Sequence, residues 1–295
     1  MSGTHAHGVR NLGRVSGPRE RTGAPVASGT AGPHTPLTWL YAPGDRPEVV
    51  RKALVSGADV VIVDLEDAVA PDRKAYALEA TADLLSDVHP VPVHVRVHTP
   101  LDIPVLTPLP GLCGLRVPKV THATDIHRIA GLAPGLPLYP LLESALAVEN
   151  AYAVASAHPA VRGIALGEAD LRSDLGVRED SGLDWSRGRL VVAARAAALP
   201  PPAQSVHPHV RDLEGLAVDC ARGRAMGFLG RAAIHPRQLP VIERAYLPTP
   251  EEVEEAREIV AATGQGALAL PDGRFVDAAV VEGAHRVLAL AARAG

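Results

Sequence analysis

Short apolar runs and segments of helical spacing alternate along the chain from Thr38 onward. An apolar run of about four to eight residues bounded by turn residues is typical of a buried strand, whereas apolar residues three and four apart indicate a helix. The pattern predicts strands at 38–42, 59–64, 92–97, 115–117, 136–142, 161–166, 203–206 and 228–234. It predicts helices at 47–57, 72–85, 121–132, 144–157, 185–198 and 212–226.

This alternation predicts an α/β fold, and specifically a (β/α)8 TIM barrel. Eight strands spread over about 200 residues fit a closed barrel better than an open, doubly wound sheet. No glycine-rich dinucleotide-binding motif follows any of the strands, which weakens a Rossmann-type alternative.

Beyond Pro236 the pattern predicts further helices and a small hairpin. Thr249-Pro250-Glu251-Glu252 is a capping box with proline at the first helical position, and it opens a helix that runs to about residue 262. Residues 267–270 and 274–276 flank a Pro-Asp-Gly turn, and a last apolar helix covers 278–292. We expect this extension either to pack on the outside of the barrel or to form a flap over an active site.

The first 36 residues differ in composition from the rest of the chain. They are rich in Gly, Arg, Ser, Pro, Thr and His and contain almost no Leu or Ile, which predicts a disordered tail. They also lack an apolar segment of the kind that a secretory signal needs. We therefore expect a tail at 1–36, a barrel at 37–247 and a C-terminal extension at 248–295.

Bulk composition excludes several classes of function. The net charge of −4 gives no basic excess for nucleic-acid binding. No apolar stretch approaches the roughly 20 residues that span a bilayer. We expect a cytoplasmic protein with small-molecule substrates.

Acidic residues recur where predicted strands end. Asp64-Leu65-Glu66-Asp67 closes the second predicted strand, Glu143 follows the fifth and Asp170 follows the sixth. Buried carboxylates are costly unless they pair with bases or hold a cation, and in such barrels the strand ends share one rim. Glu143 and Asp170 end neighbouring strands, so both could reach a Mg²⁺ ion that keeps several waters. The alternative is a rim of ordinary salt bridges.

Two basic residues belong to the same predicted rim. Arg96 ends the third strand, and Lys119 follows the fourth. A planar guanidinium suits a substrate carboxylate. Alternatively, Arg96 is a partner for Asp64 or Glu66, and the two roles can coexist.

The chain resembles the citrate lyase beta-subunit family within the HpcH/HpaI aldolase superfamily. The motifs that carry the resemblance lie in order over residues 38–247. They are Leu40-Tyr41-Ala42-Pro43-Gly44, Asp64-Leu65-Glu66-Asp67-Ala68-Val69-Ala70-Pro71 with Lys74, Val95-Arg96-Val97, Pro118-Lys119-Val120, Leu142-Glu143-Ser144, Leu166-Gly167 with Asp170-Leu171, and Ile234-His235-Pro236 with Gln238. One departure is Ala169-Asp170, where the family has a Glu-Asp pair and this chain has its glutamate displaced to Glu168.

The resemblance implies a Mg²⁺-dependent carbon–carbon lyase (with Mn²⁺ also possible) that acts on CoA-linked hydroxy acids. It implies Glu143 and Asp170 as metal ligands, and Arg96 as the catalytic group that holds the acyl carboxylate or ketone oxygen. Lys119 and Glu143 are expected to contact the substrate as well. Glu66 and Asp67 are expected to orient the arginine and metal-bound waters.

The C-terminal motif Asp272-Gly273-Arg274-Phe275-Val276-Asp277 resembles the end of malyl-CoA and citramalyl-CoA lyases. That resemblance implies that Asp277 acts as an acid or base in the active site of a neighbouring subunit. It also implies a homo-oligomer, a trimer or hexamer. A solvated surface aspartate is the alternative for Asp277. A CoA-independent aldolase acting on free 2-oxo-hydroxy acids, and a non-catalytic homologue, stay open as alternatives for the chain.

Overall fold

The computed structural model describes residue 1 and residues 35–262, 268–269 and 275–293. The chain divides into two units, 1–34 and 35–295, and the account below concerns the second. The tail expected at 1–36 falls almost entirely outside the described residues, as does the turn expected at 271–273.

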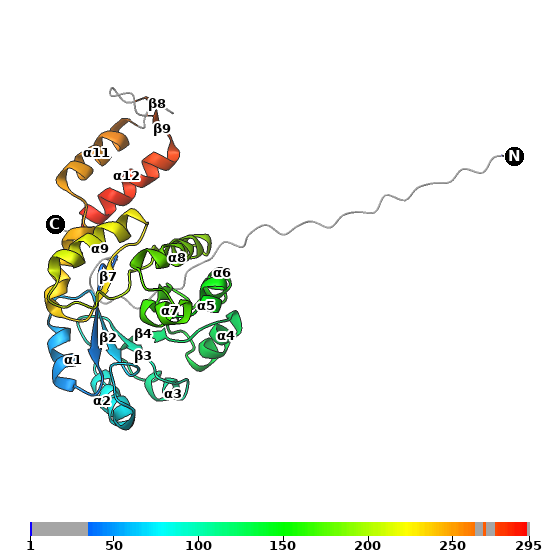
Figure 1. The fold of residues 1–295 in the computed structure, drawn as a ribbon, viewed down its shortest axis with the longest axis vertical. Helices are drawn as coiled ribbons and strands as arrows, with labels where there is room; N and C mark the ends of the chain where they lie inside the picture. Colours follow the sequence, from blue (N-terminus) through cyan, green and yellow to red (C-terminus); the bar gives the residue numbers. More distant parts are fainter. Residues whose placement is uncertain (2–34, 263–267, 270–274, 294–295) are drawn as a thin grey trace. The chain divides into compact units, whose positions relative to one another are not determined.

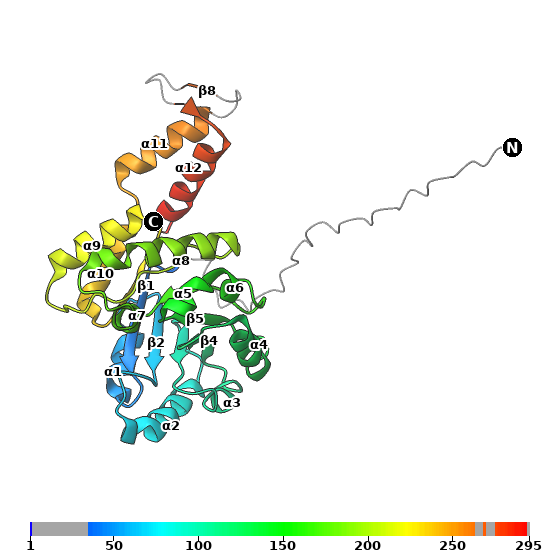
Figure 2. The same ribbon diagram turned by 45° about the vertical axis from the view of Figure 1, so that its right-hand side comes forward.

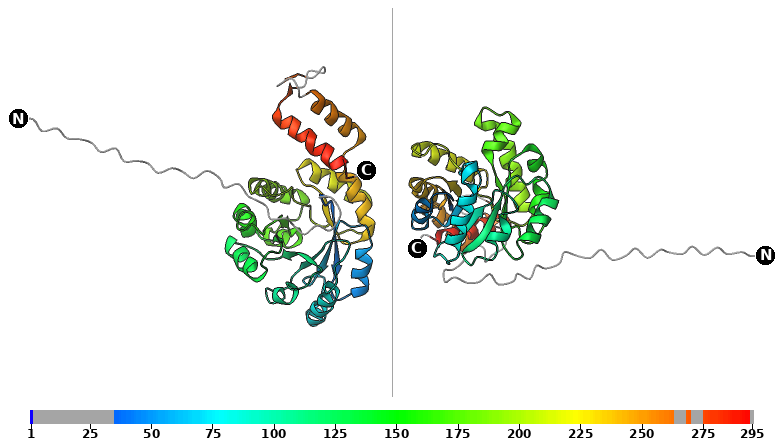
Figure 3. Two further views of the ribbon diagram at one scale, coloured as in Figure 1. Left: turned by 180° about the vertical axis from the view of Figure 1, so that it is seen from behind. Right: turned by 90° about the horizontal axis from the view of Figure 1, so that it is seen from below.

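Seven parallel strands form a curled sheet with the order β6-β5-β4-β3-β2-β1-β7 (Figures 1 and 2). They are β1 (Thr38–Pro43), β2 (Val60–Asp64), β3 (Val93–Arg96), β4 (Leu112–Val117), β5 (Leu138–Leu142), β6 (Ala165–Leu166) and β7 (Arg231–Ala233). The helices between them are α1 (Pro47–Leu54), α2 (Lys74–Leu85), α3 (Ile103–Leu106), α4 (Ala123–Leu132), α5 (Ala145–Glu149), α6 (Ala151–Ala155), α7 (Glu168–Leu175), α8 (Asp184–Ala196) and α9 (Leu213–Ala225), and α10 (Leu239–Tyr246) follows β7. The view from below in Figure 3 shows these helices arranged around the strands.

An extended segment takes the remaining place between β6 and β7. Gln204 bridges β7, since its N–H donates to the Gly230 carbonyl at 3.0 Å and its carbonyl accepts from Ala232 N at 2.9 Å. On the other side, Ser205 Oγ donates to the Leu166 carbonyl at 2.6 Å. The predicted TIM-type barrel is therefore present, with seven strands in the ladder and one position held by a bridge.

Several of the predicted elements are shorter than the hydrophobic pattern suggested, and one is divided. The strand expected at 161–166 is only Ala165–Leu166, with a separate bridge at Val161. The strand expected at 203–206 is only a bridge, because residues 200–202 are consecutive prolines that lack the N–H groups a ladder needs. The strand expected at 228–234 begins at Arg231, after Gly230 in the left-handed region at φ 80°. The helix expected at 144–157 is split at Asn150 into α5 and α6.

Two apolar layers hold the barrel together. Inside it, Trp39, Val60 and Ile62 pack with Tyr41 and Ala203. A larger core fills the space between sheet and helices. The strand β2 is buried along its whole length, and its run of β-branched residues is what a strand covered on both sides requires.

The C-terminal extension contains α11 (Pro250–Ala262), the short antiparallel strands β8 (Leu268–Ala269) and β9 (Phe275–Val276), and α12 (Ala278–Ala291). The predicted capping box is present, with Glu252 N donating to Thr249 Oγ1 at 3.2 Å and Thr249 N to Glu252 Oε2 at 2.8 Å. The helices α11 and α12 lie side by side (Figures 1 and 2) around a small core of their own that includes Ile259 and Ala284. Within the described ranges, no helix has both the length and the apolar content needed to cross a bilayer.

Candidate active site

The carboxyl ends of β2 and β3 bring a buried carboxylate and an arginine together. Asp64 and Arg96 are the last residues of these strands and pair in register. Arg96 Nε lies 2.7 Å from Asp64 Oδ1, and its Nη2 lies 2.5 Å from Oδ2. Asp64 is 1% exposed, so its charge is neutralised by this two-point contact.

The turn after β2 holds Asp64 and presents two more acids. The Asp64 carboxylate accepts from the backbone N–H groups of Glu66 at 2.9 Å and Ala68 at 3.0 Å. Lys74 Nζ donates to the carbonyls of Leu65 at 2.9 Å and Glu66 at 2.5 Å. These contacts explain why three acids and a lysine occur together in this stretch of sequence.

Glu66 and Asp67 both face the remaining nitrogen of Arg96. Nη1 lies 3.0 Å from Glu66 Oε2 and 3.1 Å from Asp67 Oδ2. Neither oxygen of Glu66 makes a hydrogen bond of good geometry among the described residues, so this buried group contributes charge rather than a directional bond. Arg96 thus has the partners expected in the alternative, Asp64 and Glu66, and the orienting role of Glu66 and Asp67 stays a prediction.

Lys119 connects the acidic turn to the next part of the rim. Its Nζ lies 3.0 Å from Glu66 Oε1, and this contact raises the pKa of the lysine. Its backbone N–H donates to Glu143 Oε2 at 3.0 Å. Lys119 is one of two non-glycine residues with positive φ among those described, at 57°.

Glu143 follows β5 and is 7% exposed. Burial raises its pKa to about 7, and the charges of Glu66 and Asp170 add to this effect. Gly167 leaves room for the side chain, because a Cβ at that position would lie 2.3 Å from Glu143 Cγ. Like-charged groups crowded around a buried carboxylate are a setting that a bound cation would stabilise.

Asp170 lies in the first turn of α7, directly after β6. Its charge contributes to the raised pKa of Glu143, and the two residues follow the neighbouring strands β5 and β6. Glu168 does not belong to this group, since Arg187 holds its carboxylate at 2.9 Å through Nε and 2.7 Å through Nη2.

A two-carboxylate site fits Mg²⁺, which commonly takes one or two carboxylates and completes its shell with water. Among residues 35–262, 268–269 and 275–293, no three or more His, Cys, Asp and Glu side chains gather in a metal-binding arrangement. A metal ion held in this part of the chain would therefore have at most two such side chains as ligands. The ligand assignment itself stays a prediction.

Arg116 is a residue near this rim that the sequence analysis missed. It lies on β4, in register with Arg96 on β3 and Tyr139 on β5. It is 6% exposed, and its guanidinium carbon lies 4.6 Å from the Tyr139 ring centroid. Burial lowers its pKa. The available signal was a charged residue inside the otherwise apolar strand 112–117.

Asp277 is exposed and opens α12. Its Oδ1 accepts from the backbone N–H groups of Ala279 at 2.9 Å and Val280 at 3.0 Å, as helix-capping aspartates do. The role in a neighbouring subunit stays a prediction.

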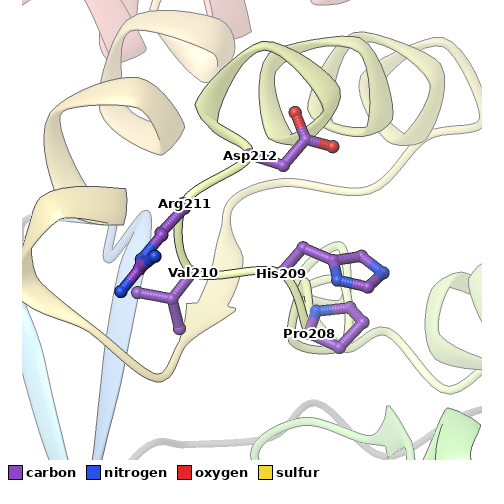
Figure 4. Close-up of a pocket in the computed structure, with 5 residues that line it drawn as sticks. All are labelled: Pro208, His209, Val210, Arg211 and Asp212. Atoms are coloured by element: carbon purple, nitrogen blue, oxygen red, sulfur yellow. The ribbon is translucent and has the colours of Figure 1, made fainter.

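A surface hollow lies in the loop before α9. It is lined by Pro208, His209, Val210, Arg211 and Asp212 (Figure 4). Asp212 caps α9 by accepting from Gly215 N at 2.9 Å. None of the predicted site residues lines this hollow, so it is separate from the candidate site.

Comparison with known proteins agrees with the fold and with the family that the sequence resembles. The model of the HpcH/HpaI aldolase/citrate lyase family matches residues 37–236, and the model of a C-C bond lyase of the TIM-barrel fold matches residues 192–291. A (3S)-malyl-CoA thioesterase of Cereibacter sphaeroides is 35% identical and covers 85% of this chain and 93% of its own length. An L-malyl-CoA/beta-methylmalyl-CoA lyase of the same species is 29% identical, with coverages of 84% and 92%.

Among solved structures, the chain is similar to CitE from Mycobacterium tuberculosis in complex with magnesium, acetoacetate and coenzyme A. The TM-score is 0.75 at 32% identity, and the match covers 87% of this chain and 98% of that one. The predicted TIM-barrel fold and family are thereby confirmed. This chain belongs to the HpcH/HpaI aldolase/citrate lyase family, enzymes that act on carbon–carbon bonds.

Proposed function

We propose that the chain is a Mg²⁺-dependent lyase that cleaves a β-hydroxyacyl-CoA of the malyl-CoA or citramalyl-CoA type. The products would be acetyl-CoA and a 2-oxo acid, and the enzyme could also run in the condensing direction. The observation that carries the proposal is that Glu143 and Asp170 follow neighbouring strands and interact electrostatically, beside a cluster of acids bound by Arg96 and Lys119. The relatives that act on malyl-CoA support the substrate class.

Cleavage requires removal of the proton from the β-hydroxyl group, which becomes a carbonyl as the adjacent carbon–carbon bond breaks. The electron pair of that bond moves to the α-carbon of the thioester as an enolate, and a proton returned there completes acetyl-CoA. Bound Mg²⁺, held by Glu143 and Asp170, would supply Lewis-acid stabilisation of negative charge. The guanidinium of Arg96 adds a fixed positive charge at the same rim.

The residues that contact Arg96 have the role of orienting it. Asp64, Glu66 and Asp67 hold Arg96 in one orientation, so that it need not reorganise during the reaction. Lys119 places its ammonium group at the same edge. We assign the proton transfer to Asp277 of a neighbouring copy, in a trimer or hexamer, and expect the enzyme in the cytoplasm.

Mass spectrometry of reactions with malyl-CoA and citramalyl-CoA tests the proposal. Carbon–carbon cleavage yields acetyl-CoA and an oxo acid, whereas thioester hydrolysis, suggested by the thioesterase relative, yields free CoA and the intact hydroxy acid. We expect cleavage that requires Mg²⁺ and is abolished by EDTA. Activity that persists in EDTA would contradict the proposal.

Variants separate the metal pair from general effects of charge removal. Glu143→Gln and Asp170→Asn should each lower kcat by at least about 100-fold, in line with loss of charge stabilisation in an active site. Glu149→Gln, an exposed acid on α5, is the matched control and should retain activity. Retro-aldol cleavage of free 2-oxo-hydroxy acids without CoA would favour the aldolase alternative. Absence of Mg²⁺ binding by calorimetry would favour a non-catalytic homologue.

A further inference from the structure

Arg116 is a buried cation with no counter-charge among the described residues. Its side chain makes no ion pair or hydrogen bond within 35–262, 268–269 and 275–293, and its Nε is fully buried without a hydrogen-bond partner. Removing a charge from water is costly unless a partner compensates it. Packing among the described residues therefore does not explain why this arginine is buried.

The position of Arg116 places it beneath the candidate site. Because it pairs in register with Arg96 on the neighbouring strand, the two side chains leave the sheet on the same face. The guanidinium carbon of Arg96 lies 5.3 Å from the centre of the Tyr41 ring, and the charges of Arg116, Asp64 and Glu143 also act on this tyrosine. Three residues further along the chain, Lys119 donates its N–H to Glu143.

Arg116 and Arg96 differ in whether their side-chain nitrogens already contact carboxylates. All the side-chain nitrogens of Arg96 face carboxylate oxygens of Asp64, Glu66 or Asp67. Those of Arg116 face none in the described part of the chain, and its flat face rests on the ring of Tyr139. The guanidinium of Arg96 is therefore already paired, whereas that of Arg116 has no partner among the described residues.

The aromatic neighbours of Arg116, His94 and Tyr139, add no second positive charge beside it. The ring of His94 stacks on Tyr139 with its centroid 4.7 Å away. Burial, with a contribution from Arg116, lowers the pKa of His94 well below its usual range, so that His94 is neutral. Arg116 is thus the local positive group in this part of the barrel interior.

We propose that Arg116 is the specificity-determining residue that receives the free carboxylate of the substrate. The site then selects hydroxyacyl thioesters with a terminal carboxylate, and 2-oxo acids in the condensing direction. A guanidinium suits this task because its N–H groups match a carboxylate in two-point contact. This assignment deepens the proposed function and rests on it.

The test compares pyruvate with pyruvamide, its uncharged amide, at saturating Mg²⁺ by calorimetry. Wild-type protein should bind pyruvate more tightly, and Arg116→Met should reduce that preference by about 10- to 100-fold, the usual value of a hydrogen bond to a charged group. Arg162→Met is the matched control, because Arg162 is exposed and also acts on Tyr139. It should leave the preference unchanged.

Two further measurements separate specificity from structure. Arg116→Met should have an unchanged or higher Tm and unchanged Mg²⁺ affinity, since it removes an uncompensated charge. Arg116→Gln provides a second, polar replacement. Wild-type pyruvate affinity in Arg116→Met would overturn the inference, as would failure of both variants to fold.

The outcomes distinguish this inference from the proposed function. Loss of the pyruvate preference in Arg116→Met, with no cleavage of CoA esters by the wild type, would support Arg116 as the carboxylate-binding residue and contradict the lyase proposal. Cleavage of CoA esters by the wild type, with an unchanged KM for the oxo acid in Arg116→Met, would support the lyase proposal and contradict Arg116 as the carboxylate-binding residue.

Discussion

Lys119 donates its backbone N–H to the Glu143 carboxylate from the left-handed region of backbone conformation. That conformation costs a residue with a side chain roughly 1 kcal/mol, whereas glycine adopts it freely. The strain is maintained at a point where two strand ends meet, and it turns the N–H of Lys119 towards the predicted metal ligand.

Replacing Lys119 with glycine and with alanine should separate the backbone from the ammonium group. Both variants lose the ion pair with Glu66, and only glycine relieves the strain at φ 57°. We expect Lys119→Gly to be more stable than Lys119→Ala by about 1 kcal/mol in urea unfolding. Equal stability of the two variants would show that the strain is absent in solution.

The pKa of Glu143 predicts how metal affinity depends on pH. Because burial raises this pKa to about 7, Mg²⁺ must displace a proton at and below neutral pH. We expect calorimetry to show affinity that increases as pH rises from 6 to 8, with proton release that depends on the buffer used. Affinity that is flat over this range would contradict the assignment of Glu143 as a ligand.

The same group predicts the pH dependence of stability in the absence of metal. Between its ordinary value near 4.5 and its folded value of about 7, the Glu143 carboxyl binds a proton more readily in the folded state than in the unfolded state. Its contribution to the free energy of unfolding is therefore present at low pH and is lost as pH rises through 7. The free energy of unfolding of the wild type, measured in urea, should be lower at pH 8 than at pH 5. This decrease should be smaller in Glu143→Gln.

We expect Asp64 and Arg96 to be strongly coupled in their contributions to the free energy of unfolding. Arg96→Met leaves a carboxylate that is 1% exposed without its partner, and removal of one member of a buried pair costs about 3–5 kcal/mol. Asp64→Asn combined with Arg96→Met should cost less than the sum of the single changes. A double-mutant cycle measured by urea unfolding checks this, and strict additivity would contradict the coupling.

Gly167 leaves room for the Glu143 side chain, so a larger residue at this position should weaken metal binding. In Gly167→Ala the new Cβ would meet Glu143 Cγ at 2.3 Å, so the carboxylate must move. We expect Mg²⁺ affinity to fall by at least about 10-fold, as happens when groups that orient metal ligands are changed. Gly188→Ala is the control, because a Cβ there meets nothing within 4 Å, and it should stabilise α8 by about 0.5–1 kcal/mol.

Much of the barrel was predictable because its strands carry strong local signals. The β-branched run that forms β2 admits few other interpretations. The seventh position was less predictable, because residues 203–206 follow three prolines and the pairing of Gln204 depends on β7, which lies more than 20 residues later. Such non-local pairing leaves little trace in a local hydrophobic pattern.

The sequence by itself determined that Asp64, Glu66, Glu143 and Asp170 would stand at strand ends, since alternation along a strand and the end of an apolar run are local properties. Only the tertiary structure decided that Arg96 is surrounded by carboxylates while Arg116 has none among the described residues. The two arginines lie in similar apolar strands, and what each one contacts depends on the register of neighbouring strands and on the turns that follow them. Charge balance is therefore a property of the assembled barrel, in which residues far apart in the chain share one low-dielectric space.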